Sequence, residues 1–115
     1  MSEFVEFLHE VFEPFGPIRS RKMFGGHGIF HQDLMFALVA DDELYIKADV
    51  DSIPEFKRRE LGPFEFHAGG EIKTMNYYRA PEEIFDDPDA ALYWAQLGFD
   101  AAVRAQRTKA KKTNK

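Results

Sequence analysis

Histidines and carboxylates are the side chains of this chain that could bind a metal ion or transfer a proton. The sequence has 4 His and 20 Asp and Glu residues. His27 and His31 are four residues apart, a spacing that on a helix would place two imidazoles on one side as a metal pair. The residues around them favour a strand and a turn, where that pair does not form. His9 and His67 add no supporting pattern, so we expect surface or locally hydrogen-bonded histidines and no metal or other cofactor.

Three glycines around His27 could form a phosphate cradle. Gly25, Gly26 and Gly28 leave the backbone accessible, as phosphate-binding loops require. A loop of the Walker kind continues into Lys-Ser or Lys-Thr at the start of a helix, whereas this segment continues into a strand. We therefore interpret it as a glycine bend or bulge at the entrance to a sheet, and not as a nucleotide site.

Nucleophilic catalysis has few candidates in this sequence. The chain has no Cys, and none of its few Ser and Thr residues lies in a nucleophile elbow. Ser2 and Ser52 are placed to cap helices, and the paired carboxylates fall in turns and helix starts, where they accept hydrogen bonds from free amides. We expect a non-enzymatic protein. The alternative is a small-ligand or metal-assisted enzyme that uses the Gly25–Gly28 segment, His27, His31 and nearby carboxylates.

Cationic and aromatic side chains offer a candidate interaction surface. Two short basic clusters lie in an acidic body, where either a solvated face or a docking patch for an acidic partner would account for them. Two adjacent tyrosines on one strand must face opposite sides, so one should pack under a helix while the other can be exposed. The candidate residues are Arg19, Arg21, Lys22, Lys57, Arg58, Arg59, Tyr77 and Tyr78.

The net charge of −5 conceals a sharp division along the chain. Residues 1–103 hold nine of the fifteen Lys and Arg and all twenty Asp and Glu, a net charge of −11, whereas residues 104–115 carry six cations and no acid, a net charge of +6. The acidic body disfavours a duplex-reading domain. We expect a domain over 1–107 and a basic disordered tail over 108–115, which gives at most weak, non-specific nucleic-acid binding.

One small domain must position all of these residues, because 115 residues bury a single core. Three strands are predicted between Lys22 and Asp49. The run Leu34–Val39 is almost wholly apolar and should be central, whereas Leu44–Ala48 alternates and should be exposed on one face. Further strands are predicted at 64–66 and 72–79, joined by a glycine turn.

A first helix is predicted at about Glu3–Glu13. A short second helix should begin at the Ser52–Glu55 capping box and end before Gly62. The last helix is predicted at about Pro88–Arg107, after the N-cap Asp87. The order α-β-β-β-α-β-β-α indicates an α+β fold, with a mainly antiparallel five-stranded sheet and helices on one face. We expect one core that contains Phe36, Leu38, Ile46, Phe56, Leu92 and Phe99. The acidic N-terminus and the lack of any long apolar run predict a cytoplasmic protein without a membrane partner.

Several long motifs resemble the N-terminal domain of the TfoX/Sxy family. They are Lys22-Met23-Phe24-Gly25-Gly26-His27-Gly28-Ile29-Phe30, Phe36-Ala37-Leu38-Val39, Leu44-Tyr45-Ile46-Lys47-Ala48-Asp49 and Met75-Asn76-Tyr77-Tyr78. Named members of that family regulate natural competence in bacteria. The resemblance implies a regulatory, protein-interaction module whose partner is a transcription component, and the family pattern names no catalytic residue. The sequence is compatible with either a monomer or a homodimer.

Overall fold

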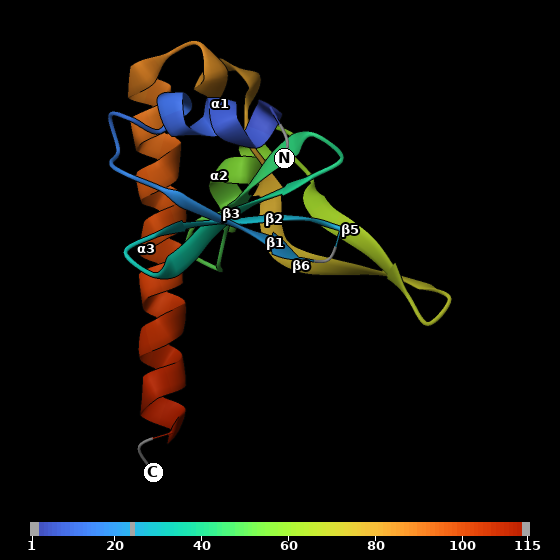
Figure 1. The fold of residues 1–115 in the computed structure, drawn as a ribbon. Coiled ribbons are helices and arrows are strands. Elements are labelled where there is room, and N and C mark those ends of the chain that lie inside the picture. The colour runs from blue at the N-terminus through green and yellow to red at the C-terminus, as the bar shows by residue number, and fades with distance from the viewer. Residues whose placement is uncertain (1–2, 24, 114–115) are drawn as a thin grey trace.

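The computed structural model describes residues 3–23 and 25–113, with side chains for 3–23 and 25–108. The helices are α1 (Glu3–Val11), α2 (Ile53–Arg58), the 3-10 helix η1 (Glu82–Phe85) and α3 (Pro88–Thr113). The strands are β1 (Arg19–Met23), β2 (Gly26–His31), β3 (Leu34–Ala40), β4 (Glu43–Lys47), β5 (Pro63–Ala68) and β6 (Glu71–Arg79). Figure 1 shows α3 as a long rod that extends past the sheet.

The strands form one antiparallel sheet in the order β1-β2-β3-β4-β6-β5. The α+β class is confirmed, but the sheet has six strands and the predicted five was wrong. The segment predicted as the first of three strands, which starts at Lys22, instead contains the end of one strand and the start of the next. β1 ends at Met23, and β2 begins at its pairing partner Gly26, so the two strands form a hairpin. The run Arg-Ser-Arg-Lys that opens β1 has no apolar alternation, so sequence periodicity gave no signal for this edge strand.

One face of the sheet is covered by all the helices. Phe12 after α1 packs edge-on against Phe36 of β3, with ring centroids 5.3 Å apart, and Phe56 of α2 packs against Tyr78 of β6 at 5.3 Å. α3 runs so close to β3 and β4 that an added Cβ on Gly98 would lie 2.7 Å from Ile46 Cγ2. Phe36, Ile46 and Phe56 are fully buried in this core, as the sequence predicted.

Other expectations about the helices need correction. Leu92 was expected in the core but is 41% exposed, and Leu38 is buried on the other face of the sheet. α1 ends at Val11, because the chain turns before Pro14. The last helix continues to Thr113, so the predicted end at Arg107 falls inside it and residues 108–113 are helical where a disordered tail was expected.

The helices also bear on membrane association. Within the described residues, none of them is both long enough and apolar enough to cross a bilayer.

Candidate interaction face

The glycine motif builds the β1–β2 hairpin, and each glycine has its own steric reason. Gly25 has φ +75°, a left-handed conformation that turns the chain back on itself. An added Cβ on Gly26 would lie 2.1 Å from the Val39 carbonyl oxygen, so the backbone of β2 approaches β3 there as only glycine allows. Phe24, the residue before Gly25, lies outside the described residues. The glycine bend inferred from the sequence is therefore present, at a hairpin turn.

Gly28 leaves room for two methionines. An added Cβ there would lie 2.9 Å from Met35 Sδ, 3.0 Å from Met23 Cε and 3.1 Å from a ring carbon of Phe30. These three side chains lie over the strand on the sheet face away from the helices. A bulge shapes the same region, because Ile29 pairs with Ala37 and Phe30 with Met35, which leaves Phe36 as an extra residue.

The strand register defines the sheet face opposite the helices, which we call the open face. Cross-strand partners share a face, and successive residues of a strand alternate between faces. Because Ile46 lies on the helix-covered face, its neighbours Tyr45 and Lys47 and their partners Arg79 and Tyr77 lie on the open face. The apolar open-face residues are Met23, Phe30, Met35, Leu38, Tyr45, Phe64, Phe66, Met75 and Tyr77.

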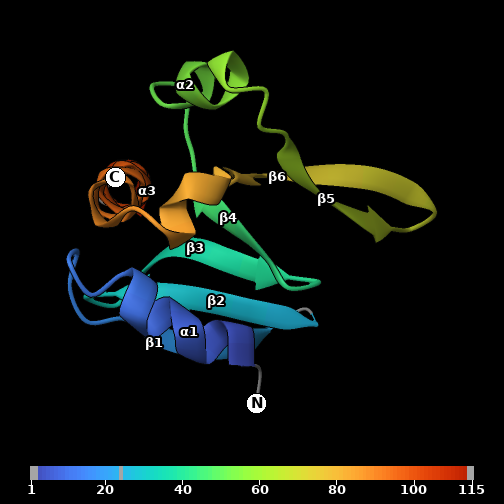
Figure 2. The ribbon, with the colours of Figure 1, turned by 90° about the horizontal axis from the view of Figure 1, so that it is seen from above.

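An apolar hollow of about 380 Å³ lies in the open face. Its lining comes from both ends of the strand order, so the sheet curves enough to bring β1 and β5 to one site. Figure 2 shows the β5–β6 hairpin reaching away from α3. The ring centroid of Phe64 lies 5.1 Å from that of Tyr45, and the Phe64 and Phe66 rings stack with their centroids 6.2 Å apart. The main lining residues are Met23, Met35, Leu38, Phe64, Phe66 and Met75.

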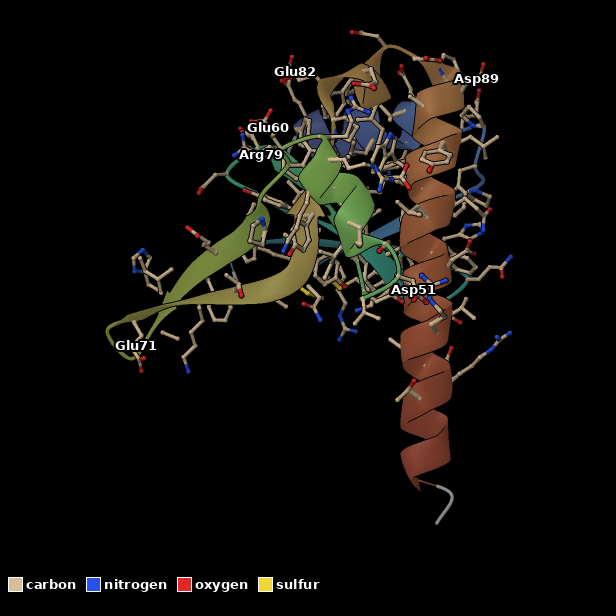
Figure 3. The ribbon with its side chains drawn as sticks, turned by 180° about the vertical axis from the view of Figure 1, so that it is seen from behind. Asp51, Glu60, Glu71, Arg79, Glu82 and Asp89 are labelled. Atoms are coloured by element: carbon tan, nitrogen blue, oxygen red, sulfur yellow. The ribbon has the colours of Figure 1, made fainter. Side chains whose placement is uncertain are left out.

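Cations lie on the same sheet face as this hollow. On β1, Arg19 and Arg21 share the face of Met23, and on β6, Lys73 pairs with Phe66. The cationic strand residues of the open face are Arg19, Arg21, Lys47, Lys73 and Arg79, and its strand carboxylates are Glu43 and Glu71. Figure 3 shows Glu71 at the tip of the β5–β6 hairpin, away from the rest of the sheet.

Three of these cations already have contacts. Arg79 forms an ion pair with Glu43, and Arg19 lies 3.1 Å from Asp33. Lys47 Nζ lies 4.9 Å from the ring centroid of Tyr77, a cation–π contact. Burial lowers the pKa of Lys47, although the charge of Asp49 opposes that shift. The Tyr77 side chain is only 5% exposed, and burial raises its pKa to about 12.

The predicted surface residues do not form one patch. Tyr77 and Tyr78 face opposite sides as predicted, and both are buried. In the first basic cluster, Arg21 and Lys22 are exposed on the β1 edge. The second basic cluster, Lys57-Arg58-Arg59, lies at the end of α2 on the helix-covered side.

That second cluster is engaged in local ion pairs. Arg59 contacts Glu83 at 2.7 Å and lies 5.8 Å from the centroid of the Trp94 ring, and Arg58 lies 3.9 Å from Glu55. Lys57 is exposed at the end of α2. The cluster on β1 borders the hollow, and the cluster on α2 does not.

The histidines considered for a metal pair are separated by the fold. His27 pairs with Val39 at one end of β2 and His31 with Leu34 at the other, about 13 Å apart at ordinary strand rise. The ring centroids of His31 and Phe15 lie 4.5 Å apart, and His31 Nδ1 lies 2.7 Å from the Pro17 carbonyl oxygen. His27 and His67 both line the hollow.

An ion-pair clamp holds α3 to the segment after β4. The Nε and Nη2 atoms of Arg104 donate to the two carboxylate oxygens of Asp49 at 2.6 and 3.0 Å, and Asp51 lies 3.5 Å from Nε. Figure 3 shows Asp51 beside α3. Ser52 makes no side-chain cap on α2, contrary to the predicted capping box, and its Oγ accepts from the Asp49 N–H at 3.0 Å. The hydrogen bond from Arg104 is the main reason that the pKa of Asp49 is lowered.

Comparison with known proteins places this sequence in a family. Residues 10–102 match the family described as the TfoX N-terminal domain. The chain belongs to the TfoX N-terminal domain family. It is 28% identical over 115 residues to the DNA transformation protein TfoX1 of Aliivibrio fischeri, which covers all of this chain and 55% of that protein. It is 27% identical over 100 residues to Protein Sxy of Escherichia coli, covering 87% of this chain and 48% of that protein. The chain thus spans about half the length of these relatives.

Residues of the Lys22–Gly28 segment, on which the resemblance was based, border the hollow of this TfoX N-terminal domain. Met23 and Gly26 line it, and Gly28 leaves the space into which Met23 and Met35 fold. Sequence reasoning singled out these motif residues but missed Met35, Phe66 and the hollow itself. The available signal was the excess of apolar residues on both faces of β3, because a strand with no helix on its second face has no other reason to be apolar there.

Proposed function

We propose that this chain is a non-enzymatic interaction module that regulates transcription through a protein partner bound at the open face. The observation that carries the proposal is the apolar, cation-bordered hollow on a sheet face that the helices leave uncovered. Exposed apolar surface with a polar rim is typical of protein-interaction sites. The likeness to a DNA transformation protein supports a role in competence for DNA uptake.

The charge distribution supports a protein partner over direct reading of a duplex. Residues 1–103 carry a net charge of −11, which repels phosphate backbones over most of the surface. The open face concentrates cations within this acidic body and therefore suits an acidic protein surface. The alternative is a small-ligand or metal-assisted enzyme that uses the Gly25–Gly28 segment, His27, His31 and nearby carboxylates. The separation of the two histidines at opposite ends of β2 disfavours a site that contains both.

Transcript profiling tests the regulatory role. The native bacterium is compared with a deletion strain that is complemented by the wild type, by Phe66→Ser in the hollow or by the control Lys57→Glu on α2. We expect the deletion to change a defined set of transcripts, and the wild type and Lys57→Glu, but not Phe66→Ser, to restore them. Equal protein levels are checked by immunoblot. Transcripts that do not change in the deletion strain would refute the proposed function.

A further inference from the structure

The hollow and its charges indicate the chemistry of the partner, an inference that rests on the proposed interaction function. At about 380 Å³ the hollow is large enough for a few apolar side chains and lies within the range of specific pockets. Methionine is unbranched and adapts to differently shaped groups. Three of the chain's four Met residues, Met23, Met35 and Met75, line the hollow. Such a lining suits the apolar side of a peptide segment.

The charge around the hollow selects among such segments. Arg21 and Lys73 are exposed and lie on opposite sides of the hollow, beside Met23 on β1 and across from Phe66 on β5. Neither cation has an ion pair among the described residues. A segment with carboxylates flanking an apolar stripe would therefore meet a cation on each side, whereas a basic segment would be repelled.

We propose that the open face binds an amphipathic acidic helix of a protein partner, with its apolar stripe in the hollow and its carboxylates toward Arg21 and Lys73. In this mode a helix uses apolar residues at i, i+3, i+4 and i+7. The remaining acidic surface of the domain disfavours the same helix elsewhere, so charge directs it to this face.

The binding test uses a designed peptide of about 15 residues, long enough to form helix. It carries Leu at i, i+3, i+4 and i+7 with Glu at most other positions, and fluorescence anisotropy of the labelled peptide reports binding to the full chain. One control peptide replaces Glu with Lys, and another scrambles the Leu positions at constant composition. We expect saturable, salt-sensitive binding of the acidic stripe alone.

Variants locate the binding site. Arg21→Glu with Lys73→Glu should weaken binding about tenfold or more, because two attractions become repulsions, whereas the control Lys57→Glu on α2 should leave the affinity within about twofold. Phe66→Ser should also weaken it. Circular dichroism establishes that each variant folds.

The methionine methyl groups give a readout that needs no variant. In wild-type protein with 13C-labelled Met, the acidic peptide should shift the methyl signals of Met23, Met35 and Met75, while the basic peptide, as the control, should leave them unchanged. Equal binding of the acidic and basic peptides, or shifts that leave these three methyl groups unchanged, would overturn the inference. So would shifts caused instead by decanoate, by phosphatidylglycerol vesicles or by raising the protein concentration alone. The peptide binding is measured on purified protein, whereas the regulatory role is measured by transcript profiling in cells. A protein that regulates transcripts without binding the peptide would refute only this inference, and one that binds the peptide without changing transcripts would refute only the proposed function.

Discussion

Single residues in this chain have roles that residue type alone does not reveal. Gly25, Gly26 and Gly28 look like one glycine-rich motif, yet they meet three different demands: a left-handed turn, a close backbone approach and space for methionine side chains. Because the three demands differ, substitution at each position should have a different cost.

The close approach at Gly26 leads to the first prediction. Gly26→Ala places a methyl group 2.1 Å from the Val39 carbonyl oxygen, so the hairpin backbone must move. We expect a loss of about 1–3 kcal/mol in the free energy of unfolding, as in overpacked cores. The control is Gly62→Ala, where an added Cβ meets nothing within 4 Å and should change stability by about 0.5 kcal/mol or less. Urea unfolding measures both, and an equal effect of the two substitutions would contradict the steric argument.

The second prediction concerns the clamp between Arg104 and Asp49. Its hydrogen bonds lower the pKa of Asp49 in the folded chain relative to the unfolded chain. A lowered folded-state pKa gives stability that is present above the unfolded pKa of about 4 and is lost as the pH falls through the folded pKa. We expect Arg104→Gln to destabilise the fold by about 1 kcal/mol at pH 7, a value kept small because both side chains are partly exposed to solvent.

A pH series of urea unfolding checks this prediction. The stability difference between the wild type and Arg104→Gln should stay constant from pH 7 to about 5 and shrink as Asp49 protonates at lower pH. Arg107→Gln, one helical turn nearer the end of α3, is the matched control and should show no such pH dependence. A difference between the wild type and Arg104→Gln that persists unchanged below pH 3 would assign the effect to packing of the Arg104 side chain.

At the scale of elements, much of the fold follows from local patterns in the sequence. β3 is predictable because Phe36 to Val39 are all apolar and all buried, and α3 because Asp87 and Pro88 mark its start. The Asp89 N–H indeed donates to Asp87 Oδ1 at 3.0 Å. β1 was missed because an edge strand needs no buried side-chain pattern, and its polar residues gave no periodic signal.

The hollow could not be predicted in the same way. It depends on the curvature of the sheet, which brings Met23 near the start of the chain to the same site as Phe66 and Met75. Strand propensity and periodicity describe each strand alone and carry no information on curvature, which comes from twist, the bulge at Phe36 and packing. The candidate residues Arg21 and Met23 were therefore identified without the surroundings that give them a role.

The third prediction tests how the helices are held on the sheet. Phe56 is fully buried and packs between Tyr78 of β6 and Trp94 of α3, with ring centroids 5.3 and 5.1 Å away. Phe56→Ala should cost about 3–5 kcal/mol, whereas Leu92→Ala on the exposed side of α3 should cost less than about 1 kcal/mol. Thermal unfolding followed by Trp94 fluorescence distinguishes them, and similar costs would mean that Leu92 contributes to the core after all.

At the scale of the whole molecule, the change from acidic to basic sequence falls where α3 leaves the sheet. The acidic body ends near the clamp at Arg104, and the part of α3 beyond it extends past the sheet (Figure 1). Residues 105–115 hold five of the six cations of the C-terminal segment and no acid, a net charge of +5. Because residues 105–115 contain no Asp or Glu, this segment should attract an external polyanion.

The last prediction follows from that division. If the body does not bind DNA, any affinity must come from the C-terminal segment, and it should be weak, independent of sequence and steeply reduced by salt. Deleting residues 108–115 removes Lys109, Lys111, Lys112 and Lys115 but retains the Arg104 clamp. Binding of two unrelated duplexes, followed by fluorescence anisotropy in a salt titration, should then nearly vanish. Up to four phosphate contacts would give a salt slope no steeper than about −4 for the full chain.

The matched control separates the two cationic regions. Arg21→Glu with Lys73→Glu changes the open face and leaves residues 108–115 intact, so it should weaken peptide binding about tenfold or more and spare most of the DNA binding. The truncated chain should show the opposite pattern, because its open face is unchanged. A sequence preference that survives truncation but is lost in the open-face variant would mean that Arg21 and Lys73 contact DNA. The role of the open face would then change from holding a protein partner to reading a duplex directly.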